Sequence, residues 1–159
     1  MIDAETLRSL LDYSPVTGVF TWRVTRGGKA HKGDVAGAVN NLGYILITVD
    51  GATYRAHRLA WLYVYGEWPE QYLDHINCVR SDNRIVNLRL ATLGQNQANR
   101  RKTKGVLPKG VKKHRKKFAA QICVDGKRMY IGVYATAELA HAAYCEAAQK
   151  AFGAYHRAE

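Results

Sequence analysis

The hydrophobic positions at the start of the chain change from helical to strand spacing. Leu7, Leu10 and Leu11 follow Asp3 at the spacing of one helix face, and Asp3 can cap that helix. Residues 14–24 begin with turn formers from Ser14 to Gly18 and end in a β-rich run. The pattern predicts a short N-terminal helix, a turn and then a strand.

The next segments alternate between loop, hairpin and helix patterns. Residues 25–42 are rich in Gly and Asn and are predicted to be a loop. Asp50-Gly51 is a strong hairpin signal between the β-rich residues 43–49 and 53–56. Residues 57–65 have the apolar density of a short buried helix, which Gly66 ends.

A second group of elements follows a polar loop at residues 80–84. Residues 86–91 can form a strand, and Thr92 with Gln95 matches a capping box that starts a helix running to about Arg100. Residues 118–124 and 127–134 are predicted strands, joined at Asp125-Gly126. An alanine-rich helix is predicted from its cap at Thr136 to about Phe152.

These elements predict an α+β protein with two parts. The expected division is an N-terminal domain at 1–101, a basic linker at 102–107 and a C-terminal domain at 108–159. The C-terminal part would be a small sheet backed by one helix. A domain of that size is expected to be only marginally stable alone.

Composition limits the class of protein. The chain has 159 residues, 47% of them apolar, and no apolar run approaches the length of a membrane span. Asp3 and Glu5 stand where a secretion signal would be basic, so we expect a cytoplasmic protein, in a bacterial host or a phage-infected cell. Cys78, Cys123 and Cys145 are widely spaced, and we interpret them as reduced thiols.

The net charge of +11 is informative because the basic residues are concentrated in one segment of the chain. Residues 83–124 contain no Asp or Glu, and they carry half of the 24 basic residues. Such a block repels itself unless a polyanion neutralises it, and nucleic acid is the natural partner. A solubilising face would scatter its charges, and a membrane-binding segment would be an amphipathic basic helix.

Four polar residues could hydrolyse a phosphodiester. The reaction needs a base to activate water, and a divalent cation with oxygen ligands can neutralise the phosphate. Asp74, His75, Asn87 and Asn96 offer this set. In a strand, Asp74 and His75 would point to opposite faces, so they can share a site only if the backbone bends or the loop folds back.

The same residues lie in a motif that resembles the HNH homing endonucleases of phages and group I introns. The matching segments are Asp74-His75-Ile76-Asn77, Asp82-Asn83-Arg84, Asn87-Leu88-Arg89 and Gln95-Asn96, with His57-Arg58-Leu59-Ala60-Trp61 upstream.

The resemblance implies a ββα-metal fold and a role for each site residue. His75 would be the general base, Asp74 and Asn96 would bind one metal ion (magnesium, or alternatively manganese), and Asn87 would hold His75 and its loop. The products would carry 3′-hydroxyl and 5′-phosphate ends. This sequence departs from the family at Cys78-Val79, where Gly-Asp is common. For Asn77 and Asn83 turn formation is at least as good an interpretation, and for His57 packing is the better one.

A second resemblance covers about residues 106–155. Lys109-Gly110-Val111-Lys112, residues 118–122, residues 127–134 and residues 136–140 are similar to the APETALA-type domain of plant ethylene-response factors. That family lays a three-stranded antiparallel sheet, packed on one helix, into the major groove. Tyr130 could instead pack on a neighbouring strand. The resemblance and the basic cluster together predict these DNA-binding residues: Arg100, Arg101, Lys109, Lys112, Lys113, His114, Arg115, Lys116, Lys117, Gln121, Arg128 and Tyr130.

The sequence therefore predicts an enzyme, a metal-dependent endonuclease acting on double-stranded DNA. We expect a monomer with no small-molecule cofactor and no membrane partner. The alternative is a DNA-binding protein without catalysis, such as a regulator or a decayed nuclease. RNA binding has less support because the sequence shows no aromatic RNA-recognition motif.

Overall fold

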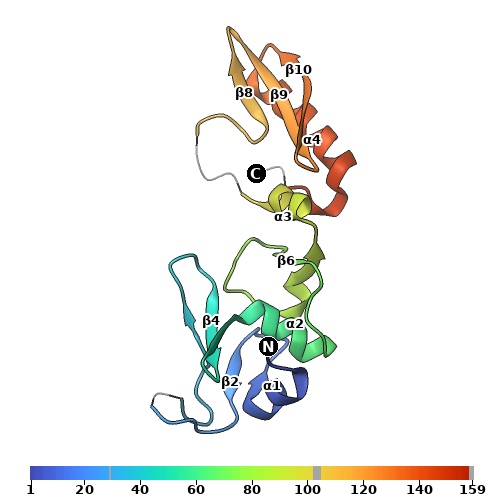
Figure 1. Cartoon of the computed structure of the whole chain (residues 1–159). Helices are drawn as coiled ribbons and strands as arrows, with labels where there is room; N and C mark the ends of the chain where they lie inside the picture. The colour runs from blue at the N-terminus through green and yellow to red at the C-terminus, as the bar shows by residue number, and fades with distance from the viewer. Residues whose placement is uncertain (29, 102–104, 158–159) are drawn as a thin grey trace. The chain divides into compact units, whose positions relative to one another are not determined.

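The computed structural model describes residues 1–28, 30–101 and 105–157, and it is a mixed α/β structure with small antiparallel sheets (Figure 1). The chain forms two compact units, Met1–Leu90 and Ala91–Glu159. The division falls before the linker predicted at 102–107, of which residues 102–104 lie outside the described residues. The predicted domain boundaries thus stay a prediction.

The first unit begins with a helix and a short hairpin. Its elements are α1 (Ala4–Leu10), β1 (Leu11–Tyr13), β2 (Phe20–Trp22), β3 (Ala38–Val39), β4 (Ile45–Val49), β5 (Ala52–Arg55), α2 (Ala56–Tyr65), β6 (Tyr72–His75), the 3-10 turn η1 (Ile85–Asn87) and β7 (Leu88–Ala91). Asp3 caps α1 through Thr6 N, as predicted. Leu11 does not continue the helix but pairs with Trp22, because the backbone becomes extended at that residue.

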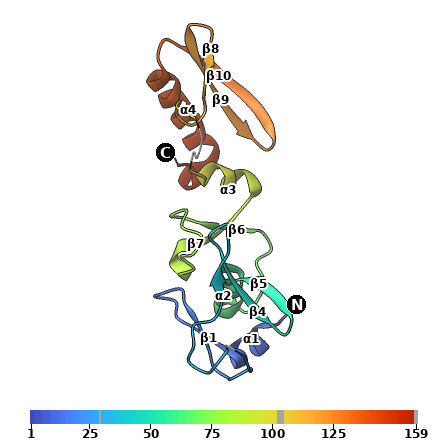
Figure 2. The same cartoon turned by 90° about the vertical axis from the view of Figure 1, so that its left-hand side faces the viewer.

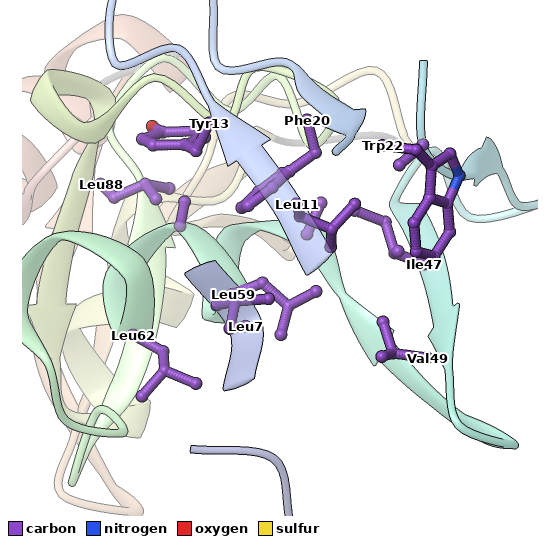
Figure 3. Close-up of a cluster of buried hydrophobic side chains, with 13 residues drawn as sticks. Leu7, Leu11, Tyr13, Phe20, Trp22, Ile47, Val49, Leu59, Leu62 and Leu88 are labelled. Carbon is purple, nitrogen blue, oxygen red and sulfur yellow. The ribbon is translucent and has the colours of Figure 1, made fainter. Parts of the chain in front are cut away.

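The core of the first unit forms where α1 and α2 meet the two hairpins. Leu7, Leu11, Ile47 and Leu59 are fully buried there, and Figure 3 shows them with the aromatic rings around them. The predicted hairpin at Asp50-Gly51 is confirmed, since both residues have positive φ between β4 and β5.

Two segments of this unit differ from their predicted structure. The predicted loop at 25–42 contains the two-residue strand β3, which pairs with β4. The predicted strand at 86–91 begins only at Leu88, because residues 85–87 form a 3-10 turn in which Asn87 N donates to Arg84 O. That turn is set by hydrogen bonds of the preceding loop, which strand propensity does not encode.

The second unit contains α3 (Leu93–Asn99), β8 (Val111–His114), β9 (Lys117–Val124), β10 (Lys127–Tyr134), α4 (Ala137–Phe152) and the 3-10 turn η2 (Gly153–Tyr155). The strands form one antiparallel sheet with β9 in the centre, and α4 packs on one of its faces (Figure 2). The small side chains of α4 and Gly110 permit a close approach, because a Cβ at Gly110 would lie 2.1 Å from the Tyr144 ring. The predicted sheet-and-helix arrangement of residues 108–152 is therefore present.

The helix caps follow the predicted chemistry. The capping box of Thr92 and Gln95 is formed in both directions at the start of α3. Thr136 caps α4 through Leu139 N, and Gly153 follows the last residue of the helix. In the described part of the chain, no helix has the length and apolarity needed to span a membrane.

Candidate active site

The site is built where β6 ends and the chain turns sharply. Strand β6 pairs with β7, and it brings Asp74 and His75 to positions where only 4% and 6% of each residue is exposed. Ile76 N donates to Asn87 O, and Cys78 N donates to His75 O, both at 2.9 Å. The backbone therefore bends directly after His75. This bend is one of the two ways in which Asp74 and His75 could share a site.

Asn87 fixes the loop that follows His75. Its Oδ1 accepts from Asn77 N at 3.0 Å, and its Nδ2 donates to Asn77 Oδ1 and to Asp82 O at 3.0 and 2.9 Å. A buried amide with this many partners is strongly oriented. This is the arrangement that the positioning role predicted for Asn87 requires.

Asp82 reinforces the same loop from its other end. Its carboxylate accepts from Asn77 Nδ2 at 2.7 Å and from the Arg84 guanidinium at 2.8 and 2.6 Å. These charge-assisted bonds, chiefly the one with Arg84, lower the pKa of Asp82 to about 2. The loop is thus closed by a carboxylate that stays ionised at all ordinary pH values.

Asn83 connects the hydrophobic core to His75. Asn83 is 1% exposed, its backbone oxygen accepts from Tyr13 Oη at 2.7 Å, and its Oδ1 lies 3.4 Å from His75 Nε2. An amide oxygen only accepts, so the contact favours the ring form with the proton on Nε2 and the basic lone pair on Nδ1. The sequence interpretation of Asn83 as a turn former is thus incomplete, because the side chain also contacts the candidate base.

The environment of His75 favours a neutral ring. Burial lowers the pKa of His75, and the Asn83 hydrogen bond and the charges of Asp74 and Asp82 oppose that shift only in part. A neutral imidazole can accept a proton from water at physiological pH.

His57 on α2 packs edge-on against His75. The ring centroids are 4.9 Å apart at an interplanar angle of 79°, and His57 is 4% exposed. The packing role predicted for His57 agrees with this position. Within the described residues, the buried Nδ1 of His57 has no hydrogen-bond partner. The sequence does not show that the residue on which His57 packs is His75 itself.

We expect the first unit to lose stability in mild acid because of His57. Burial lowers the pKa of His57 to about 3 in the folded protein, so below pH 6.5 the unfolded chain binds a proton that the folded chain excludes. His57 alone should therefore make the free energy of unfolding fall by about 1.4 kcal/mol per pH unit as the pH drops from about 6 to 4. Urea unfolding followed by tryptophan fluorescence measures this, since Trp22, Trp61 and Trp68 all lie in this unit.

The matched variants are His57→Leu and His31→Gln. His57→Leu should flatten the pH dependence by about one proton, leaving the part that comes from buried His75. His31 is an exposed imidazole in the same unit, and its replacement should leave the slope as in the wild type. An unchanged slope in His57→Leu would contradict the assignment.

Asp74 forms a buried ion pair with Arg89 on β7. Arg89 Nε and Nη2 both lie 2.9 Å from Asp74 Oδ2, and the two side chains are 17% and 5% exposed. Pairing of this kind holds the Arg89 charge at a site with little water.

The predicted metal ligands can bind a hard cation such as magnesium only through their oxygen atoms. Asp74 supplies a carboxylate, and magnesium commonly uses one or two carboxylates together with substrate phosphate and water. Asn96 lies on α3, in the second unit, so the predicted pairing of Asp74 with Asn96 stays a prediction. Over residues 1–28, 30–101 and 105–157, no group of three or more His, Cys, Asp or Glu side chains forms a metal site.

Cys78 stands at a backbone position that favours glycine. Its φ is 61°, in the left-handed region, where a side chain costs about 1–2 kcal/mol. Cys78→Gly should therefore raise the free energy of unfolding by roughly 0.5–1 kcal/mol, because the relief of this strain exceeds the cost of the larger backbone entropy that glycine has in the unfolded chain. The midpoint of urea unfolding measures this, and Cys78→Ala, which keeps the Cβ, should show no such gain.

In the second unit, the predicted DNA-binding residues Lys112, Gln121, Arg128 and Tyr130 share one sheet face. The register pairs Tyr130 with Gln121, Arg128 with Cys123, and Lys112 with Ala119. Residues such as Ala120 and Ile122 point the other way, into the core under α4. Tyr130 is 66% exposed, so it does not serve mainly as packing for a neighbouring strand. We refer to the face of Lys112, Gln121, Cys123, Arg128 and Tyr130 as the open sheet face.

The remaining predicted DNA-binding residues are all exposed except Lys109. Lys109 Nζ donates to Ala98 O, Arg100 O and Arg157 O, so its ammonium ties segments of the second unit together. Arg115, with φ 53°, lies in the tight turn between β8 and β9. The exposed group comprises Arg100, Arg101, Lys113, His114, Arg115, Lys116 and Lys117.

Comparison with known proteins addresses the first unit and α3. No curated protein and no solved structure shows a significant match to this chain. The resemblance of residues 106–155 to the APETALA-type domain therefore stays a prediction. Residues 54–98 match the family model described as HNH endonuclease, and this segment carries Asp74, His75, Asn87 and Asn96.

Proposed function

We propose that the protein is a metal-dependent DNA endonuclease in which His75 is the general base. The observation that carries the proposal is the position of His75: buried at the end of β6, next to Asp74, against Asn83 Oδ1, and within a segment that matches the HNH endonucleases. A DNA-binding protein without catalysis has no need of this combination.

The chain's own residues would act mainly by holding and moving one proton. Asn83 fixes the His75 ring so that Nδ1 can take a proton from the attacking water, and Asn87 keeps the loop 76–84 in the shape that allows it. Asp74, together with Asn96, would hold magnesium or manganese. A bound cation of this kind would neutralise charge on the phosphate and on the leaving 3′ oxygen.

We further propose that the open sheet face of the second unit docks on double-stranded DNA in the major groove. Arg128 and Gln121 can read base edges there, while the lysines contact phosphates. The covalent link raises the concentration of the nuclease at DNA, so a weak cleavage site can still act. We also propose that the protein acts as a monomer and as a homing-type nuclease on double-stranded DNA.

Metal dependence is the test that separates this function from simple DNA binding. The full chain is incubated with supercoiled plasmid and magnesium or manganese, with and without a chelator, and nicked and linear products are measured. We expect cleavage only with metal, and DNA affinity that survives in chelator. DNA binding without cleavage on plasmid and on phage and host DNA would favour the non-catalytic alternative.

Cys123 provides a test of the open sheet face. It is the exposed cysteine, and it lies opposite Arg128 on that face. Duplex DNA should protect Cys123 from maleimide labelling in chelator, by an extent that falls as salt is raised. Labelling at an unchanged rate in saturating DNA would place the DNA elsewhere.

A further inference from the structure

Two arginines of the first unit converge on one aromatic ring beside the site. The guanidinium carbons of Arg55 and Arg80 lie 4.8 and 5.1 Å from the centroid of the Tyr44 ring. The same ring lies 5.4 Å from the His57 ring and 6.1 Å from the His75 ring. Two positive charges are therefore held next to the candidate base.

Three separate elements hold this group in place. Arg55 ends β5, Arg80 lies in the loop after β6, and Tyr44 follows the turn that Asn40 closes through bonds to Leu42 N and Tyr44 N. Arg80 Nη1 also donates to Leu42 O at 2.8 Å. Stacking on the ring restricts two flexible side chains that would otherwise sample many rotamers.

These arginines differ from four others in the same unit because no acid neutralises them. Arg23, Arg26, Arg84 and Arg89 form ion pairs with Asp12, Asp50, Asp82 and Asp74. Among the residues that the structure describes, no carboxylate lies within ion-pair distance of Arg55 or Arg80. Both residues are exposed, so an external anion can reach them.

We propose that Arg55 and Arg80, held on Tyr44, form a clamp for a DNA backbone phosphate next to the one that is cleaved. A guanidinium matches a phosphate with paired N–H donors, and an anion placed here removes the repulsion between the two cations. The clamp rests on the proposed nuclease function and goes beyond it, because it assigns a DNA contact to the first unit. All the DNA-binding residues predicted from the sequence lie in the second unit.

Binding of a fluorescently labelled duplex oligonucleotide by the full chain in chelator tests the clamp without cleavage. Loss of the clamped phosphate should reduce the magnitude of the slope of log affinity against log salt by about 0.9, which is about a tenfold loss of affinity at about 0.1 M salt. We expect this full effect from the double variant Arg55→Gln with Arg80→Gln, and part of it from each single variant. Arg55→Lys and Arg80→Lys should recover part of the affinity, because lysine restores the charge but not the paired donors. The matched control is Arg58→Gln, which removes the same charge from a guanidinium that lies 5.6 Å from the Trp68 ring instead.

Tyr44 variants test whether the ring organises the clamp. Tyr44→Phe keeps the aromatic face and should bind as the wild type does, while Tyr44→Leu keeps apolar volume and should lose affinity. Tryptophan fluorescence and urea midpoints verify that each variant is folded.

Cleavage of plasmid, measured in parallel, separates this proposal from the proposed function. Weakened binding in both arginine variants with a wild type that never cleaves would support a phosphate clamp at this site. It would overturn the nuclease, and with it the placement of that phosphate beside a cleaved one. Wild-type salt slopes in Arg55→Gln and Arg80→Gln, or an equal loss in Arg58→Gln, would overturn the clamp, and an active wild type would leave the nuclease standing.

Discussion

Replacing His75 with alanine is expected to lower the rate of DNA cleavage by about 10²–10⁴-fold, the usual contribution of a general base. DNA affinity should stay within about twofold of the wild type, because the basic residues of the second unit are untouched. Single-turnover cleavage of plasmid with magnesium measures the first quantity, and duplex binding in chelator measures the second. Addition of free imidazole should restore part of the lost rate.

The control for this experiment must separate catalysis from folding. His75 is buried against His57 and Asn83, so alanine also leaves a cavity. His75→Gln keeps more of the volume and an amide that can bond to Asn83, but it supplies no base, and it should be as inactive as alanine. His31→Ala removes an exposed imidazole and should cleave normally. Equal cleavage by wild type and both His75 variants would show that His75 is not the base.

Local sequence signals predicted most elements of the fold. The caps at Asp3, Thr92 and Thr136 and the hairpins at 50–51 and 125–126 act within a few residues, and all are present. The exceptions arise where distant contacts decide, as at Leu11, which leaves the helix to pair with Trp22. The turn at 85–87 is another, because Asn87 bonds to the preceding loop, from its side chain to Asp82 O and from its backbone N to Arg84 O.

The candidate site was predictable in its residues but not in its supports. The spacing of 74, 75, 87 and 96 marks a motif, and residues 54–98 match the corresponding family. The roles that require three-dimensional contact could not be read from spacing. Asn83 reaches His75 only because the loop folds back, and His57 lies far from His75 in sequence yet packs on its ring.

The ion pair of Asp74 and Arg89 should make the stability of the first unit sensitive to the loss of either charge. Asp74→Ala should destabilise the first unit by about 3–5 kcal/mol, because Arg89 then loses the carboxylate that pairs with its charge at a site with little water. Arg89→Met should have a cost of similar size, since it removes the guanidinium that pairs with the buried carboxylate. The urea midpoint followed by tryptophan fluorescence reports this unit selectively.

The double variant Asp74→Ala with Arg89→Met separates the structural role of Asp74 from its proposed catalytic one. With both charges removed, the desolvation cost disappears as well, and stability should return to within about 1–2 kcal/mol of the wild type. Cleavage should not return, because a stable fold without the Asp74 carboxylate has lost a proposed metal ligand. If the double variant regained cleavage together with stability, Asp74 would be a structural partner of Arg89, and the metal would have to be bound by other oxygen atoms.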